Sequence, residues 1–130
     1  MREVLDYVGD LPLVAHNAGF DRRFYDMELG RICRKRKQDF ICSLRVARRI
    51  FPEAQNHKLA TLVRLAHVQP PRHHRALGDA IMTARLWSHM IKLIQGRHRM
   101  REVPLALMES LQFVPVRDGH QQIAKWAQPA

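Results

Sequence analysis

Two short apolar runs, each followed at once by a helical pattern, constrain the fold of this chain most. The first run is Leu13–His16 and the second is Asp39–Cys42. Strands that alternate with helices indicate the α/β class. Two strands of this length make a very small sheet, and a sheet this small rarely stands alone. We therefore expect a helix-rich α/β fold whose sheet is incomplete on its N-terminal side.

The helices follow from apolar spacing and from capping residues. Asn17 offers an N-cap for a helix over Ala18–Lys35, and Ser43 offers one for Leu44–Ile50. Gly96 is expected to end the longest helix. The other expected helices are Arg2–Val8, Lys58–Ala66, Ala76–Gln95, Leu105–Leu111 and Gln121–Trp126.

The length and composition indicate a globular protein. Hydrophobic residues make up 46% of the 130 residues, which is enough for a core. No apolar run approaches the length of a membrane helix, so no membrane partner is expected. Cys33 and Cys42 cannot form a disulfide framework, and a cytoplasmic location is the default.

The charge balance is strongly basic. Lys and Arg number 22 against 12 Asp and Glu, which leaves a net charge of +10. A basic balance of this size favours a polyanionic partner, usually nucleic acid. Simple solubility is the alternative interpretation, and composition alone does not separate the two.

The first motif with chemical potential runs from Val14 to Asp21. It places Asp21 in the first turn of a helix, just past the carboxyl end of a strand. Ligands collect at that edge of an α/β sheet. The alternative is a carboxylate that only stabilises the helix dipole.

The second motif is His74–Ala80, which opens the longest helix. Asp79 is expected in its first turn, and His74 precedes the helix in a loop. The small Ala76 and Ala80 would let this helix approach a sheet closely. The alternatives are a dipole-stabilised turn for Asp79 and a solvated loop position for His74.

Together the motifs resemble one family, the DEDDh 3′→5′ exonucleases of ribonuclease H-like fold. Among its members, the epsilon proofreading subunit of bacterial DNA polymerase III and its relatives are the most similar. The resemblance extends from about Arg2 to Gln95 and keeps the order of four blocks. These blocks are A-H-N-x-x-F-D at Ala15–Asp21, Cys42–Leu44, Asn56–Leu59 and H-x-A-x-x-D-A at His74–Ala80.

The resemblance implies a metal-dependent nuclease. Members of this family hold two divalent metals with four carboxylates and use a histidine as general base. Asp21 and Asp79 match two of the carboxylates, and His74 matches the base. Mg²⁺ or Mn²⁺ would be the cofactor, since hard cations prefer oxygen ligands.

Four further residues are candidates for binding nucleic acid: Asn17, Phe20, Arg72 and Arg75. Arg72 and Arg75 flank His74, where they could meet a phosphate backbone. Phe20 could wedge against a terminal base or simply pack in the core, and Asn17 could orient the site or cap its helix. The expected partners are single-stranded DNA or 3′ ends and a DNA polymerase subunit.

One part of the family pattern is missing. The family's first motif is a strand carrying D-x-E, and the only acids before Asp21 here are Glu3, Asp6 and Asp10. We therefore expect an N-terminally truncated member, with a partial exonuclease domain over residues 1–96 and a helical appendage over residues 97–130.

The resulting hypothesis is a 3′→5′ exonuclease that hydrolyses 3′-terminal phosphodiesters of DNA by a two-metal mechanism. A catalytically inactive nucleic-acid-binding remnant is the first alternative, and a polymerase-associated scaffold fragment is the second. The sequence leaves open whether the substrate is DNA or RNA.

Overall fold

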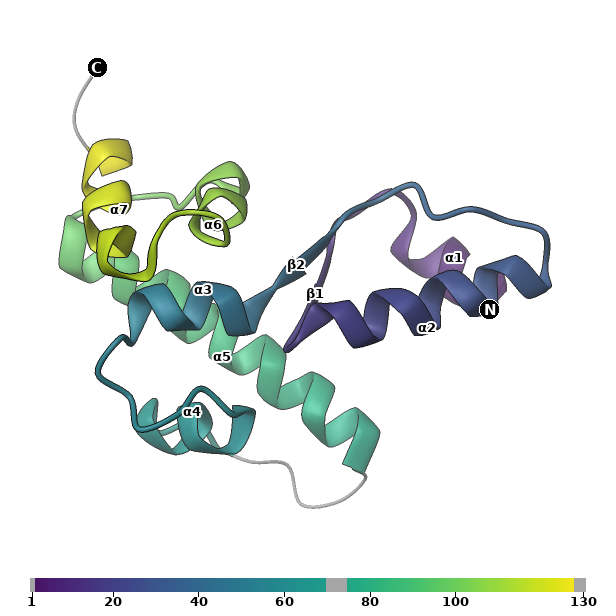
Figure 1. Ribbon diagram of the computed structural model, residues 1–130, viewed down its shortest axis with the longest axis horizontal. Helices are drawn as coiled ribbons and strands as arrows, with labels where there is room; N and C mark the ends of the chain where they lie inside the picture. Colours follow the sequence, from purple (N-terminus) through teal and green to yellow (C-terminus); the bar gives the residue numbers. More distant parts are fainter. Residues whose placement is uncertain (1, 70–74, 128–130) are drawn as a thin grey trace.

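A computed structural model describes residues 2–69 and 75–127 of the chain (Figure 1). Helices dominate it, and two short strands lie in the N-terminal third. In chain order the elements are α1 (Arg2–Val8), β1 (Leu13–Ala15), α2 (Ala18–Arg31), β2 (Phe40–Cys42), α3 (Ser43–Ile50), α4 (Leu59–Leu65), α5 (Arg75–His98), α6 (Leu105–Leu111), the 3₁₀ turn η1 (Val116–Asp118) and α7 (Gly119–Ala127).

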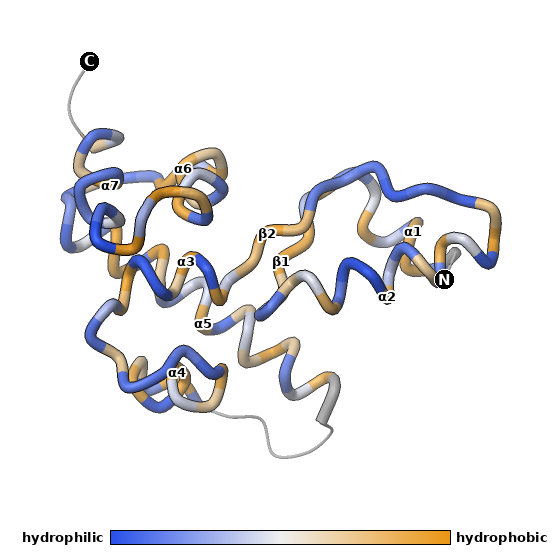
Figure 2. The backbone as a smooth tube through the Cα atoms, viewed as in Figure 1, coloured by the Kyte–Doolittle hydropathy of each residue, from blue (hydrophilic) through white to orange (hydrophobic). Residues whose placement is uncertain are grey.

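The sheet consists of β1 and β2, which pair in parallel with α2 as the crossover between them. Leu13 is opposite Phe40, and Ala15 is opposite Cys42. All six strand residues are apolar, as the colours of Figure 2 show. The expectation of a helix-rich α/β fold with only a small part of a sheet is confirmed.

The hydrophobic core is built around α5. Leu86, Met90 and Ile94 of this helix are at most 2% exposed, and they belong to the same buried cluster as Val46 and Ile50 of α3. Figure 1 shows α3, α4, α6 and α7 gathered about α5, while α1 and α2 extend to the other side of the strands. The core therefore depends on helix packing more than on the sheet.

The segment after Gly96 contributes to this same core. Leu107, Leu111 and Ile123 are fully buried within the cluster. The side-chain oxygen of Gln112, Oε1, accepts a hydrogen bond from the Cys42 backbone N–H at 2.8 Å. Residues after α5 thus contact the end of β2, and the division of the chain between residues 96 and 97 stays a prediction.

Two helix ends differ from the sequence predictions. α2 ends at Arg31 rather than Lys35, because Cys33 adopts a left-handed conformation with φ of 55°. α5 continues through Gly96 to His98, because glycine is tolerated inside a helix and the left-handed residue is Arg99, with φ of 53°.

The solvent side of α2 carries an apolar stripe. Phe20, Phe24 and Met27 are 66%, 56% and 54% exposed, and they recur at helical spacing. A sheet with so few strands covers little of this helix. No helix among the described residues combines the length and the apolar character needed to cross a bilayer.

Two glycines provide a test of the packing between α7 and α3. A Cβ atom at Gly119 would lie 2.6 Å from Arg49 Cβ and 2.8 Å from the Arg49 carbonyl oxygen, whereas a Cβ atom at Gly96 would meet nothing within 4 Å. We expect Gly119→Ala to lower the free energy of unfolding by about 1–3 kcal/mol.

Gly96→Ala is the matched control in this experiment. It should raise the free energy of unfolding by about 0.5–1 kcal/mol, because alanine is the better helix former. Urea unfolding of both variants measures the two changes. Changes of the same sign would contradict the close contact between α7 and α3.

Candidate functional site

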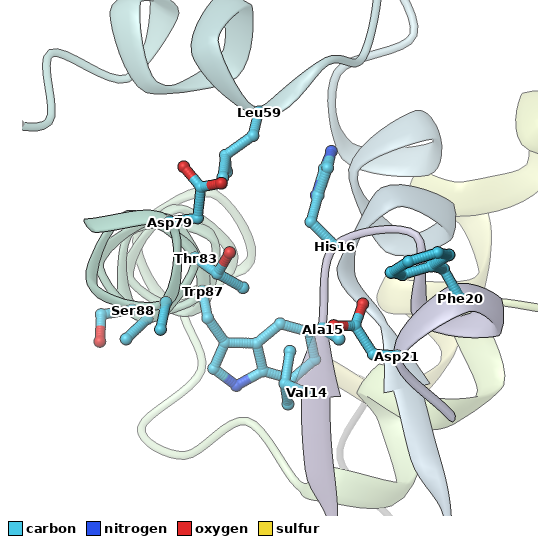
Figure 3. Close-up of a pocket in the computed structure, with 12 residues that line it drawn as sticks. Val14, Ala15, His16, Phe20, Asp21, Leu59, Asp79, Thr83, Trp87 and Ser88 are labelled. Carbon is cyan, nitrogen blue, oxygen red and sulfur yellow. The ribbon is translucent and has the colours of Figure 1, made fainter. Parts of the chain in front are cut away.

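A groove of about 750 Å³ lies between β1 and α5 (Figure 3). Val14 and Ala15 form its wall on the strand side, and Ala80, Thr83 and Trp87 form its wall on the helix side. The acidic residues of both sequence motifs line it. The groove is thus the place where the two motifs meet in space.

Asp21 and Asp79 enter the groove from different elements. Asp21 lies in the first turn of α2, as predicted, and Figure 3 shows it on the strand side. Asp79 lies on α5 on the other side. The prediction of a first-turn position for Asp79 is wrong, because α5 already begins at Arg75 and has no acid in its first turn.

A left-handed residue turns the chain from β1 into α2. Asn17 has φ of 65° and ψ of 59°, and its side chain makes no capping hydrogen bond. The prediction of a side-chain cap is therefore wrong, although Asn17 does occupy the N-cap position. Asparagine suits this turn because it tolerates the left-handed region better than most residues. The turn sets the start of α2, and with it the place of Asp21.

The imidazole of His16 holds this turn in place. Its Nε2 atom lies 2.7 Å from the carbonyl oxygen of His57, which can only accept, so Nε2 carries the proton and donates. Its Nδ1 atom lies 2.9 Å from Ser43 Oγ, whose hydroxyl donates to the neutral ring. The prediction that Ser43 caps α3 is wrong, because Cys42 is the N-cap residue. The hydroxyl of Ser43 bonds to His16 instead.

A second contact supports the same turn. The backbone N–H of Ala18 lies 3.4 Å from the Sγ atom of the buried Cys42. His57 is itself fixed, because its Nε2 atom lies 2.7 Å from the Phe51 carbonyl oxygen. The turn after β1 is thus bonded to the end of β2, to the start of α3 and to the segment before α4.

Burial lowers the pKa of His16 below its ordinary value of 6.5. The hydrogen bond to the His57 carbonyl opposes this effect, and the charges of His57 and Arg48 add to it. The neutral ring is therefore favoured. Since both of its nitrogens are engaged, His16 is not free to take a proton from a ligand in the groove.

The structure describes only some of the other predicted site residues. His74 and Arg72 lie outside the described residues. Arg75 is the first residue of α5, and its side chain lies outside the described part. Phe20 is on the rim of the groove and 66% exposed, so it is not a core residue.

The charge of the groove contrasts with that of the chain. No Lys or Arg is among its described lining residues, although the sequence contains 22. Over residues 2–69 and 75–127, no group of three or more His, Cys, Asp or Glu side chains is placed to hold a metal ion. Asp21 and Asp79 are thus the two acids that the described structure offers to a cation here.

Sequence reasoning missed the roles of His16 and Ser43. Both residues belong to the motif blocks, but their spacing of 27 residues gives no sign that the side chains meet. The available signal was a histidine placed directly between an apolar strand and the start of a helix. A polar ring at that position needs partners for both nitrogens when it is partly buried.

Comparison with known proteins shows which proteins this chain is similar to. The family model RNase_T, described as Exonuclease, matches residues 1–87. The chain is also similar to DNA polymerase III PolC-type proteins. The protein from Bacillus subtilis (strain 168) is 36% identical over 94 residues, which are 71% of this chain and 6% of that relative.

Two further relatives carry the same name. The protein from Listeria innocua is 34% identical over 99 residues, and the one from Caldanaerobacter subterraneus is 31% identical over 107 residues. These matches cover 75% and 81% of this chain but only 7% and 8% of the relatives. The chain therefore spans a small part of the proteins that it resembles. No solved structure matches it.

The His16 contacts predict a pH-dependent stability. Because the pKa of the folded state is lowered, the contribution of His16 is present above the unfolded pKa of about 6.5 and is lost as pH falls through the lower folded value. We expect His16→Gln to lower the free energy of unfolding at pH 7.5 by about 1–3 kcal/mol. The difference should shrink at pH 5.

The exposed His67 provides the control. His67→Gln should leave the pH profile close to that of the unaltered chain, which separates His16 from the other histidines. Urea unfolding at several pH values measures both profiles. A stability difference for His16→Gln that is constant from pH 7.5 to pH 5 would contradict the assignment of a neutral, doubly bonded ring.

Proposed function

The chain belongs to the exonuclease family, and from this membership we propose that its groove receives the 3′ end of a nucleic acid strand for hydrolysis of the terminal phosphodiester. One observation carries the proposal. The acids of the two sequence motifs, Asp21 and Asp79, line a single groove from different elements. The PolC-type relatives favour DNA as the substrate and a DNA polymerase as the partner, in the cytoplasm.

Asp21 and Asp79 are chemically suited to a divalent cation. Both residues are exposed on the groove, and neither belongs to an ion pair within the described part of the chain. Carboxylate oxygens are the ligands that Mg²⁺ and Mn²⁺ prefer. Such a cation, when bound, polarises a phosphoryl oxygen and stabilises the negative charge that develops in the transition state.

His74 is our candidate for the general base. An imidazole that titrates near neutrality can accept the proton of the attacking water and later release it. His16 lines the groove, but its two nitrogens are already bonded to His57 and Ser43. We therefore assign the support of the site to His16 and the proton transfer to His74.

Four residues would bind the nucleic acid strand. Phe20 is exposed on the rim, where its ring can stack on a base. Arg72 and Arg75 flank the candidate base and would neutralise phosphates, and Asn17 precedes the helix that carries Asp21. Since no Lys or Arg is among the described residues of the groove walls, the strand would be held mainly by residues outside those walls.

An inactive nucleic-acid-binding remnant or a polymerase-associated scaffold is the alternative function. The described groove offers two carboxylates, whereas the family resemblance implies four. Two carboxylates hold metals weakly, and catalysis would lose most of its electrostatic support. Binding and hydrolysis therefore need separate tests.

The first test measures metal binding. We expect Mn²⁺ to bind in the millimolar range without nucleic acid, because few ligands are available, and we expect Asp21→Asn and Asp79→Asn each to weaken it. Calorimetry, together with the electron paramagnetic resonance signal of free Mn²⁺, measures the Mn²⁺ affinity of the chain and of each variant. Glu53→Gln, at an exposed position outside the groove, is the matched control. Micromolar Mn²⁺ binding that Asp79→Asn leaves unchanged would contradict the assignment of Asp79 as a metal ligand.

The second test measures hydrolysis of 3′-labelled single-stranded DNA and RNA with Mn²⁺. We expect no measurable activity from the 130-residue chain. We expect activity from a chain extended at its N-terminus by an apolar strand carrying D-x-E. In the extended protein, His74→Ala should reduce the rate by roughly 10²–10⁴-fold, and Asp79→Asn should also impair it.

Two outcomes would overturn parts of the proposal. Robust activity of the unextended chain, abolished by His74→Ala, would show that two described carboxylates suffice. An inactive extended chain that still binds single strands would support the remnant instead. Glu53→Gln again serves as the control.

A further inference from the structure

We propose that the segment after α2, Arg34–Lys37, binds the phosphate backbone of a nucleic acid strand at a place separate from the groove. We call this segment the basic loop. Binding there goes beyond the proposed function, because it requires neither a metal nor hydrolysis. Three features of the basic loop carry the inference: its charge, the contacts that hold it, and the residues that surround it.

The basic loop is the longest run of Lys and Arg in the sequence. Its residues are Arg34, Lys35, Arg36 and Lys37, and no acid interrupts them. Arg34, Lys35 and Lys37 are exposed, and none of the three belongs to an ion pair within residues 2–69 and 75–127. Unpaired cations in a row attract a polyanion and bind it by releasing its counterions.

The end of α2 does not need these cations as caps. Cys33 is left-handed, with φ of 55°, and its backbone N–H donates to the Gly30 carbonyl oxygen at 3.1 Å. The backbone N–H of Arg34 donates to the Leu29 carbonyl oxygen at 2.9 Å. These two bonds form a Schellman motif, in which the backbone itself satisfies carbonyl groups at the end of a helix. The cationic side chains are therefore left for a ligand.

Two side chains anchor the basic loop to the rest of the fold. Arg36 donates from Nε to Asp26 Oδ1 at 2.8 Å and from Nη1 to the Gln38 carbonyl oxygen at 2.7 Å. The buried Gln38 donates from Nε2 to the Gly9 carbonyl oxygen at 3.3 Å. Because these contacts already restrict the loop, it loses less conformational entropy when it binds a ligand.

A hollow of about 580 Å³ lies beside the loop, at the C-terminal end of α2. Three residues of the loop line it, Arg34, Lys35 and Arg36, and the acid of its described lining, Asp26, is already paired with Arg36. No large apolar side chain is among the described lining residues. A protein interface or a membrane surface would require apolar contact. The hollow therefore suits a phosphate chain, which arginine contacts through two parallel N–H donors.

The basic loop and Asp21 lie at opposite ends of α2. This helix has 14 residues, which at about 1.5 Å per residue place its ends roughly 20 Å apart. Figure 1 shows the chain leaving α2 at the end far from α5 and returning to β2, and Figure 2 shows that the returning segment is largely hydrophilic. One phosphate group cannot contact both places, so the loop would hold a different part of a strand from the part in the groove.

The first experiment uses the thiol of Cys33 as a reporter, without metal. Cys33 is exposed and lines the hollow, whereas Cys42 is buried. We expect an oligothymidylate of about 20 nucleotides to slow the alkylation of Cys33 by iodoacetamide at least about threefold, because the bound strand covers the thiol. An unchanged rate would overturn the inference.

A second thiol provides the matched control for this experiment. In a chain that carries both Cys33→Ser and Arg64→Cys, the reactive thiol lies at an exposed position of α4. It should react at the same rate with and without the strand. Slowing of equal size at the two positions would overturn the location.

The second experiment measures the salt dependence of oligothymidylate binding by fluorescence anisotropy. The loop variant combines Arg34→Gln, Lys35→Gln and Lys37→Gln, and the control variant combines Arg64→Gln, Lys92→Gln and Lys125→Gln, which remove the same charge from exposed positions on three other helices. The loop variant should reduce the slope of log affinity against log salt by about 2, since each phosphate contact on a single strand contributes about 0.7. The control variant should keep the slope of the unaltered chain.

Equal slopes for the two variants would overturn a local site in favour of diffuse attraction by the whole surface. Circular dichroism checks that both variants fold. If the loop variant does not fold, the alkylation of Cys33 in the chain of native sequence still decides the proposal.

Two competitors separate nucleic acid from other acidic partners. A peptide of alternating glutamate and leucine and vesicles that contain phosphatidylserine should each displace the oligothymidylate at least about tenfold less effectively than unlabelled oligothymidylate does. The reason is that the hollow offers no apolar contact to a leucine side chain or an acyl chain. Displacement as effective as that by the unlabelled strand would overturn the inference in favour of that competitor.

These binding tests are independent of the nuclease assay. A chain in which the strand protects Cys33, but whose extended form hydrolyses nothing, would count against the proposed function alone. An extended chain that hydrolyses nucleic acid while Cys33 reacts at an unchanged rate would count against this inference alone.

Discussion

The hydrogen bonds of one neutral imidazole join the parts of this molecule that form the groove. His16 follows β1, Ser43 begins α3 and His57 precedes α4, and the His16 ring bonds to both of the other residues. The left-handed Asn17 and the contact from Ala18 to Cys42 fix the direction in which the chain leaves the strand. The place of Asp21 follows from these local constraints, because α2 begins where they end.

The helices supply the rigidity that the small sheet lacks. α5 contributes buried residues to the core along much of its length, α3, α4 and α7 pack against it, and α6 packs on α3 and α7. This arrangement holds the wall that carries Asp79 mainly through helix packing. The groove therefore lies between a wall held by helix packing and a wall held by a two-stranded sheet, and the second wall depends more on single contacts such as those of His16.

The sequence was sufficient for features that depend on local patterns. Apolar runs and helical spacing located both strands and the helices, and the motif order indicated the exonuclease family. The sequence was insufficient where contacts between residues far apart in the chain determine the local structure. The side chain of Ser43 bonds to His16 instead of capping its own helix, and α5 passes through Gly96 because the left-handed residue comes only at Arg99. The family resemblance implies a common metal site for Asp21 and Asp79, whereas the apolar groove that both residues line is visible only in the structure.

The bond from Cys42 to Gln112 has a consequence for self-association. Open-ended polymerisation of a sheet requires two free edges in every copy, one to accept a strand and one to pass the ladder onward. Here the side chain of Gln112 accepts the backbone N–H of Cys42 on the outer side of β2, so this donor is not open to a further strand. A strand of another copy can therefore not form the full ladder of hydrogen bonds along the outer edge of β2, which limits open-ended polymerisation at that edge.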